Sequence, residues 1–157
     1  MKSNTKSLQE QYAPYGICFG CGCQNHKGLQ IKSYVGKDSS INAEWSPQSH
    51  HEAFPGVING GIIGSLLDCH SNWAAAYFIM KDQSLKITPC TVTAEYKVKL
   101  RRPTPSDGLL QIDAKLTKID GNKAWIDSRI IVNDKLCATC DGLFVAVGED
   151  HPAYHRW

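Results

Sequence analysis

The sequence predicts an α+β fold in which a five- to six-stranded antiparallel sheet wraps around one long central helix. One segment only, residues 59–80, has apolar residues at helical spacing. Most of the remaining chain alternates apolar and polar residues with a period of two, interrupted by turn sequences. The length of 157 residues suits a single domain, and one helix of this length can cover one face of such a sheet.

The predicted helix carries an unusual polar stripe. Asn59 is a suitable N-cap, and the residues that follow are mostly apolar and fit for burial. Ser65, Asp68 and Asn72 stand at i, i+3 and i+7, so they share one side of the helix. Small residues flank them, which leaves room around the polar groups.

The strands are expected at residues 29–34, 40–45, 92–100, 110–116, 124–132 and 136–147. Turn sequences separate the last four, and we expect three consecutive hairpin-type connections there. Residues 46–58 hold two prolines and a glycine, which favours an irregular loop. We therefore expect a flexible N-terminal arm over residues 1–16, a domain over 17–148 and a C-terminal tail over 149–157.

Composition narrows the possible functions. The formal net charge is +2, too small for a dedicated nucleic-acid binder. The apolar part of the predicted helix is interrupted by polar residues, so no membrane span is expected. The first 14 residues are polar and show no secretory signal, which favours a cytoplasmic protein.

Seven cysteines are present, an odd number that favours reduced thiols over disulfides. Cys137 and Cys140 lie in a predicted strand, where the two side chains would point to opposite faces. The sequence CFGCGC at 18–23 has the glycines of a zinc knuckle, but only three nearby cysteines and His26. We therefore expect small, partly buried thiols and no metal, with a structural zinc as the alternative.

The start of the helix is a candidate for binding a carbonyl oxygen. Gly60 and Gly61 allow close approach to free N–H groups at the positive end of the helix dipole. Such groups can stabilise negative charge on a carbonyl oxygen. Alternatively, the two glycines only permit a tight turn into the helix.

Asp68 is the candidate for the reacting group. A carboxylate on an otherwise apolar helix is costly unless it is paired or hydrated. It could act as a general base on water or attack a carbonyl directly; alternatively, it is a hydrogen-bonded core aspartate. Eight residues separate it from Gly60, about 12 Å along a helix. If both take part, the site must combine two subunits, because both groups have to lie close to one carbonyl.

These residues resemble a known family. HEAFPGVINGGIIGSLLD is similar to the central-helix motif of hotdog-fold acyl-CoA thioesterases of the PaaI-like branch, which usually has His-Gly-Gly followed by an Asp. TAEYKVKLRRPTP, from Thr93, matches the family's next strand, and CFGCGCQNHKGL resembles a turn that precedes the first strand in some members. The resemblance covers roughly residues 17–147 and implies the hotdog fold.

The resemblance implies hydrolysis of an acyl-CoA to a free acid and CoA. Asp68 would be the general base or nucleophile, and Gly60, with Gly61, would polarise the carbonyl from the opposite subunit. Thr93 would hydrogen-bond the attacking water or steady Asp68. In a regular strand, however, Thr93 would point away from the apolar face. Either a bulge turns it, or the face that carries Thr93 contacts the partner subunit and the substrate. No cofactor is implied beyond the CoA of the substrate, and the expected assembly is a homodimer, with a homotetramer as its further association.

Asn59 departs from the family pattern, which has a histidine at this position. Asparagine can cap a helix and hydrogen-bond, but it cannot transfer a proton near neutral pH. A non-catalytic acyl-CoA or lipid binder with the same fold is therefore the alternative. A hydratase is a weaker one, because it would need a catalytic histidine near the helix start.

Overall fold

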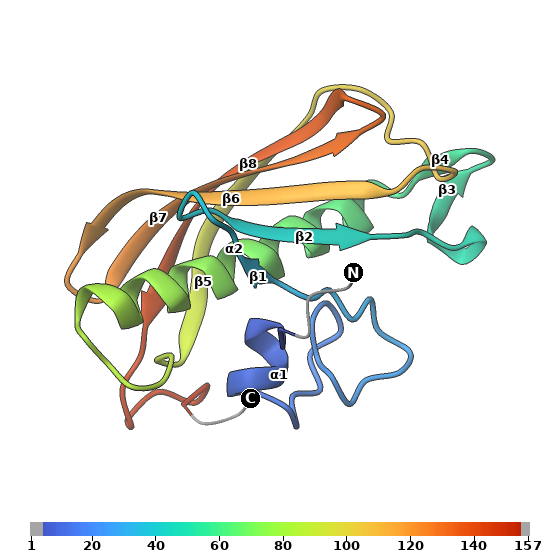
Figure 1. Ribbon diagram of the computed structural model, residues 1–157. Helices are drawn as coiled ribbons and strands as arrows, with labels where there is room; N and C mark the ends of the chain where they lie inside the picture. Colours follow the sequence, from blue (N-terminus) through green and yellow to red (C-terminus); the bar gives the residue numbers. More distant parts are fainter. Residues whose placement is uncertain (1–4, 155–157) are drawn as a thin grey trace.

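A curved sheet holds one long helix on its inner face (Figure 1). The computed structural model describes residues 5–154. The strands of the main sheet are β1 (Tyr34–Val35), β2 (Ile41–Trp45), β5 (Thr91–Leu100), β6 (Leu110–Asp120), β7 (Lys123–Val132) and β8 (Lys135–Ala146). The other elements are α1 (Leu8–Tyr12), the 3-10 turn η1 (Ser49–His51), β3 (Glu52–Phe54), β4 (Val57–Ile58) and α2 (Gly60–Asp82). The predicted fold class is confirmed.

The strands are ordered β1-β2-β6-β7-β8-β5, and every neighbouring pair is antiparallel. The expectation of three consecutive hairpins is wrong for the first connection. β5 pairs with β8 at one edge, and β6 pairs with β2 and β7, so residues 101–109 cross to another part of the sheet. Pro103 and Pro105 lie in this connection, and Pro105 bridges to Val57 of β4. A turn sequence marks where a strand ends, but it does not identify the next partner.

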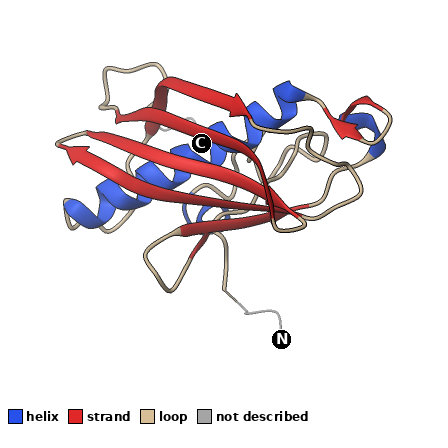
Figure 2. Ribbon diagram, turned by 90° about the horizontal axis from the view of Figure 1, so that it is seen from above, coloured by secondary structure: helices blue, strands red, loops and turns tan. Residues whose placement is uncertain are grey.

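The helix α2 is the centre of the core. Asn59 Oδ1 accepts hydrogen bonds from the N–H groups of Gly61 and Ile62, so Asn59 is the N-cap as predicted. The helix has 23 residues, a length of about 34 Å, and runs beneath the strands (Figures 1 and 2). Its inward side chains include Ile63, Leu66, Leu67 and Ile79, which are at most 1% exposed. Burial of each such side chain contributes roughly 1.5–3 kcal/mol, so the sheet and the helix stabilise each other.

Two predictions for the N-terminal half need correction. Residues 29–33 form no ladder with the main sheet, and Gln30 among them has a φ of 50°, which interrupts an extended strand; instead Leu29 and Ile31 donate backbone hydrogen bonds to Phe19 and Gly20. The strand therefore begins only at Tyr34. The loop expected at 46–58 contains η1 and the small β3–β4 hairpin.

The expected flexible arm is packed where the structure describes it, from residue 5. Ser7 and Glu10 form a capping box that begins α1. Leu8 is buried against the second half of α2, and its N–H donates to Ser33 O. Polar composition alone did not reveal these contacts. Residues 1–4, and residues 155–157 of the expected tail, lie outside the described residues.

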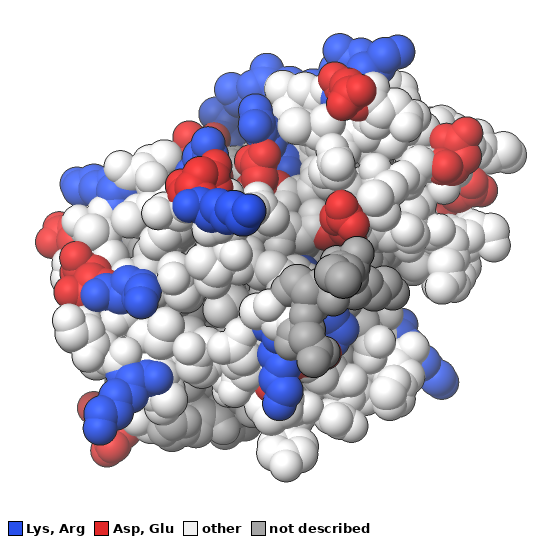
Figure 3. Space-filling model, viewed as in Figure 1, with Lys and Arg blue, Asp and Glu red and all other residues white. Residues whose placement is uncertain are grey.

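Charged side chains of both signs are interspersed on the face shown in Figure 3. This distribution agrees with the small net charge of +2. Among residues 5–154, no helix is both long and apolar enough to cross a membrane.

A buried histidine links α2 to the sheet and to the N-terminal segment. His70 is fully buried; one ring nitrogen, Nε2, lies 2.9 Å from Ile41 O, and Nδ1 lies 2.8 Å from Ser33 Oγ. Ser33 Oγ also accepts from the Gln9 side-chain amide. A neutral ring that donates from Nε2 and accepts at Nδ1 satisfies this chain of hydrogen bonds. Burial lowers the pKa of His70 to about 4, against the raising effects of Ile41 O and Asp113.

This low pKa predicts a loss of stability in mild acid. The unfolded chain binds a proton at His70 below about pH 6.5 and the folded chain only below about 4, so stability falls across that window as pH is lowered. We expect His70 alone to reduce the free energy of unfolding by about 2 kcal/mol between pH 7 and pH 5. Urea unfolding at several pH values measures this loss.

The variant His70→Gln should show a shallower decline, whatever its stability at pH 7. His26→Gln, at an exposed position, is the control and should keep the wild-type slope. Equal slopes for all three proteins would contradict the assignment.

Candidate functional site

Asp68 lines a cavity of about 240 Å³ that lies between three parts of the chain. Residues from the segment 13–22 form one wall, and Thr93 of β5 forms another. The helix α2 contributes Asp68, Cys69, Asn72 and Trp73. The polar stripe predicted on the helix thus faces a cavity at two of its three positions. The third member, Ser65, hydrogen-bonds to Gly61 O within the helix.

The Asp68 carboxylate is partly withdrawn from water and is held by one strong hydrogen bond. Thr93 Oγ1 donates to Asp68 Oδ1 at 2.6 Å. Burial raises the pKa of Asp68, the Thr93 hydroxyl opposes that rise, and the nearby Cys18 adds to it. Because Oδ1 is occupied by Thr93, the other carboxylate oxygen is the one available to a water or a substrate.

Thr93 reaches Asp68 because strand β5 is irregular. The register with β8 shifts between Thr93 and Glu95, which marks a β-bulge. Before the bulge, Thr91 and Thr93 point toward α2; after it, Tyr96 and Leu100 lie beside the helix, against Gly64 and Gly60. Of the two explanations offered for the parity of Thr93, the structure therefore has the bulge.

Asn72 is a polar group in the cavity whose role the sequence did not indicate. Its Nδ2 donates to Thr91 O at 3.3 Å. Its Oδ1 is buried and has no hydrogen-bond partner among the described residues. A buried acceptor of this kind is normally satisfied, so Asn72 Oδ1 carries a cost in stability.

The helix start has one free donor. The N–H groups of Gly61 and Ile62 donate to Asn59 Oδ1, at 2.8 and 3.3 Å. The Gly60 N–H makes no hydrogen bond within the described part of the chain, and Gly60 is exposed. The Asn59 side chain thus accepts from the Gly61 N–H, whereas the Gly60 N–H is left as the donor that faces solvent.

The structure does not bring the helix start and Asp68 together within one chain. Both lie on the straight helix α2, eight residues or about 12 Å apart. Neither Asn59, Gly60 nor Gly61 lines the Asp68 cavity. The predicted site residues therefore form two separate pairs in the single chain, Asp68 with Thr93 and Asn59 with Gly61.

Three cysteines meet beside Asp68. Cys18 and Cys21 of the N-terminal turn lie against Cys69 of α2, and their sulfur atoms are all within 4.8 Å of one another. The Trp73 indole N–H donates to Cys21 Sγ at 3.3 Å. The sequence suggested Cys23 and His26 as companions of the first pair, but neither joins this cluster. Only the fold could place Cys69 there, because 48 residues separate it from Cys21.

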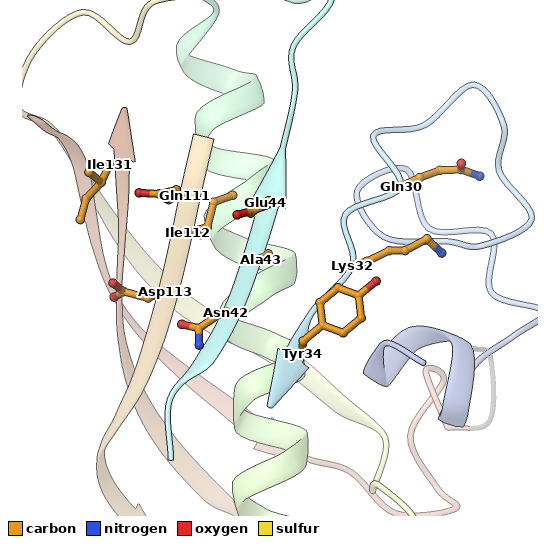
Figure 4. Close-up of a pocket in the computed structure, with 10 residues that line it drawn as sticks. All are labelled: Gln30, Lys32, Tyr34, Asn42, Ala43, Glu44, Gln111, Ile112, Asp113 and Ile131. Carbon is orange, nitrogen blue, oxygen red and sulfur yellow. The ribbon is translucent and has the colours of Figure 1, made fainter. Parts of the chain in front are cut away.

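A wider depression lies on the outer face of the sheet (Figure 4). Its volume is about 650 Å³, and Asn42, Glu44 and Gln111 line it from β2 and β6, with Lys32 and Tyr34 across from them. These exposed side chains alternate with the ones that pack on α2. It contains neither Asp68 nor the helix start, so the cavity at Asp68 is the better candidate for chemistry.

Comparison with known proteins identifies the fold. No protein-family model matches the chain, and no curated protein matches it. Solved structures do. A thioesterase superfamily protein from Shewanella loihica has a TM-score of 0.64 and 26% identity, over 75% of this chain and 91% of that one.

Two further structures agree. Another thioesterase superfamily protein has a TM-score of 0.71 and 22% identity, over 92% of this chain and 68% of that one. The E. coli PaaI protein from the phenylacetic acid degradation operon has a TM-score of 0.64 and 16% identity, over 76% of this chain and 81% of that one. The chain therefore has the hotdog fold, and it resembles the thioesterase superfamily that includes PaaI, as its central-helix motif predicts.

Proposed function

We propose that the protein hydrolyses an acyl-CoA thioester to a free acid and CoA. The observation that carries the proposal is the half-buried Asp68 carboxylate, fixed by Thr93 at 2.6 Å on the wall of a cavity. Asp68 takes a proton from a water molecule as the water attacks the thioester carbonyl; the C–S bond then breaks, and the CoA thiolate leaves and takes up the proton. In the other route the carboxylate itself attacks, CoA leaves, and water hydrolyses the resulting anhydride. Similarity to thioesterase superfamily structures supports this chemistry.

Asn72 lies one helical turn after Asp68, and both residues line the same cavity. The Asn72 Nδ2 donates to Thr91 O, which ties this part of α2 to strand β5.

We propose that the active unit is a homodimer in which Gly60 of one subunit and Asp68 of the other act on the same thioester. The thioester oxygen gains negative charge in the transition state, and the free Gly60 N–H at the positive end of α2 can stabilise it. The distance along α2 prevents one chain from supplying both groups. Strand β5 is an edge of the sheet, and its Tyr96 and Leu100 are 45% and 60% exposed beside the start of α2. This edge is a suitable surface for the second subunit.

A non-catalytic acyl-CoA binder is the second candidate. Asn59 favours it, because its side chain is engaged as the helix cap and has no proton to transfer near neutral pH. Binding of an acyl-CoA by the wild-type protein without release of a thiol would identify this function.

The first prediction concerns Asp68→Asn. Asparagine keeps the shape and can still accept from Thr93, but it is neither a base nor a nucleophile. We expect kcat for acyl-CoA hydrolysis to fall by roughly 10²–10⁴-fold. Release of free thiol from short, long and aryl acyl-CoAs measures it. Because burial penalises the charged carboxylate, the free energy of unfolding at pH 7 should be unchanged or higher.

Asp82→Asn is the matched control. Asp82 ends the same helix but is exposed and remote from the cavity, so its removal should leave hydrolysis unchanged. Full activity in Asp68→Asn would refute the assignment.

The second prediction concerns the pH dependence. The Thr93 hydroxyl lowers the pKa of Asp68 against the effect of burial, so Thr93→Val should raise that pKa further. Since a general base must be ionised, the acidic limb of the kcat/KM profile should move to higher pH. Thr91→Val, on the same strand and face but without contact to Asp68, should leave the limb in place. A limb that moves equally in both variants would contradict the role of Thr93.

The third prediction tests the shared site. Gly60→Pro removes the N–H at the first helical position, where proline is tolerated, and Asn59 already has the extended ψ of 135° that precedes a proline well. We expect a loss of about 10²–10³-fold in kcat, while Gly60→Ala, which keeps the N–H, should lose much less.

Co-refolding the Gly60→Pro and Asp68→Asn chains should restore activity. With random pairing, half of the dimers are heterodimers, and each heterodimer has one intact site out of two. The expected activity is therefore about a quarter of that of the wild type. No recovery, with heterodimers present by mass spectrometry, would show that each chain works alone.

A further inference from the structure

The turn at residues 16–22 and helix α2 bring three thiols to one point. Cys18 Sγ and Cys69 Sγ are 3.7 Å apart, and Cys21 Sγ lies within 4.8 Å of both. A disulfide would need about 2.05 Å between sulfurs. A tetrahedral zinc with Zn–S bonds of about 2.3 Å separates its sulfurs by about 3.8 Å. The spacing of Cys18 and Cys69 excludes a disulfide in this structure. It matches both a thiol–thiol hydrogen bond and the separation of two sulfur ligands on a tetrahedral metal.

The turn has the form of a metal knuckle. Gly22 N–H donates to Cys18 O at 2.8 Å, which closes a tight turn between the two cysteines. The turn thus holds Cys18 and Cys21 on one side of the cluster, facing Cys69 of α2.

Two glycines are needed for this geometry. A Cβ at Gly20 would lie 2.3 Å from Cys69 Sγ, and one at Gly22 would lie 2.4 Å from Cys18 N. Any other residue at position 20 would occupy the space of the third thiol. The turn is thus shaped for the close approach of Cys69, which chain reversal by itself does not require.

The cluster also has room for a fourth ligand. Cys18, Cys21 and Cys69 line the same cavity as Asp68. Water or a side chain of this cavity can complete a tetrahedron. Three thiolates are soft ligands, which select zinc over magnesium or calcium. Three adjacent thiolates repel one another, and a divalent cation removes that repulsion.

We propose that Cys18, Cys21 and Cys69 bind one Zn²⁺, which ties the N-terminal turn to α2 and fixes one wall of the Asp68 cavity. The thiols lose their protons to solvent as the metal binds. With three thiolates the site has a net charge of −1, which suits a structural zinc better than a Lewis acid. The expectation of no metal counted ligands only along residues 18–26 and lacked Cys69. The proposal does not rest on the hydrolytic function.

The test is the zinc content of untagged full-length protein, purified with a reductant and without chelator. We expect about one zinc ion per chain by inductively coupled plasma mass spectrometry. Cys69→Ser and Cys18→Ser should lower zinc affinity at least about tenfold in competition with a chromophoric chelator. Cys23→Ser is the matched control, because it lies in the same turn but outside the cluster, and should retain the metal.

A second measurement does not depend on the variants' folding. Cobalt added to metal-free wild-type protein should give the intense visible bands of a tetrahedral thiolate site, and zinc should abolish them. Wild-type protein that neither contains nor takes up zinc would overturn the proposal. Equal zinc retention by Cys69→Ser and wild type would overturn it as well. Both results are obtained without substrate, so they are independent of whether the protein hydrolyses acyl-CoA.

Discussion

The burial of α2 against the curved sheet is the constraint on which the rest of the structure depends. Its inward residues, such as Leu66, Leu67 and Ile79, are fully buried, and they fix both the rotation and the position of the helix. With that face occupied by the core, Asp68 and Asn72 necessarily turn toward β5 and the N-terminal segment. The Asp68 carboxylate is thus placed by apolar packing, and its partial burial follows from its position at the margin of the core.

The bulge in β5 adapts the sheet to this carboxylate. A regular strand alternates its faces throughout, so it could not present Thr91 and Thr93 to the helix and then Tyr96 and Leu100 as well. One extra residue reverses the parity and permits both. The result is a polar contact at Asp68 and an apolar surface beside Gly60, on the same edge strand. The contact with Asp68 and the exposed apolar side chains are thereby separated on the two halves of β5.

The N-terminal segment belongs to the site although its sequence looks like a loose arm. Residues 13–22 close the cavity, Leu8 enters the core, and Gln9 hydrogen-bonds to Ser33, which contacts the buried His70. The proposed metal would add a further link at Cys69. A hotdog core of one helix and one sheet leaves the Asp68 side of α2 open, and this segment covers it.

Thr93 was a candidate only because its strand resembles that of the hotdog thioesterases. The sequence by itself determined the helix, its Asn59 cap, the antiparallel strands and the candidacy of Asp68. These features are encoded locally, by periodicity, capping chemistry and the cost of a carboxylate on an apolar helix. The tertiary structure decided that β5 pairs with β8, that Thr93 reaches Asp68 through a bulge, and that Cys69 joins Cys18 and Cys21. Each of these depends on contacts between residues distant along the chain, and periodicity along one segment carries no information about which other segment will meet it.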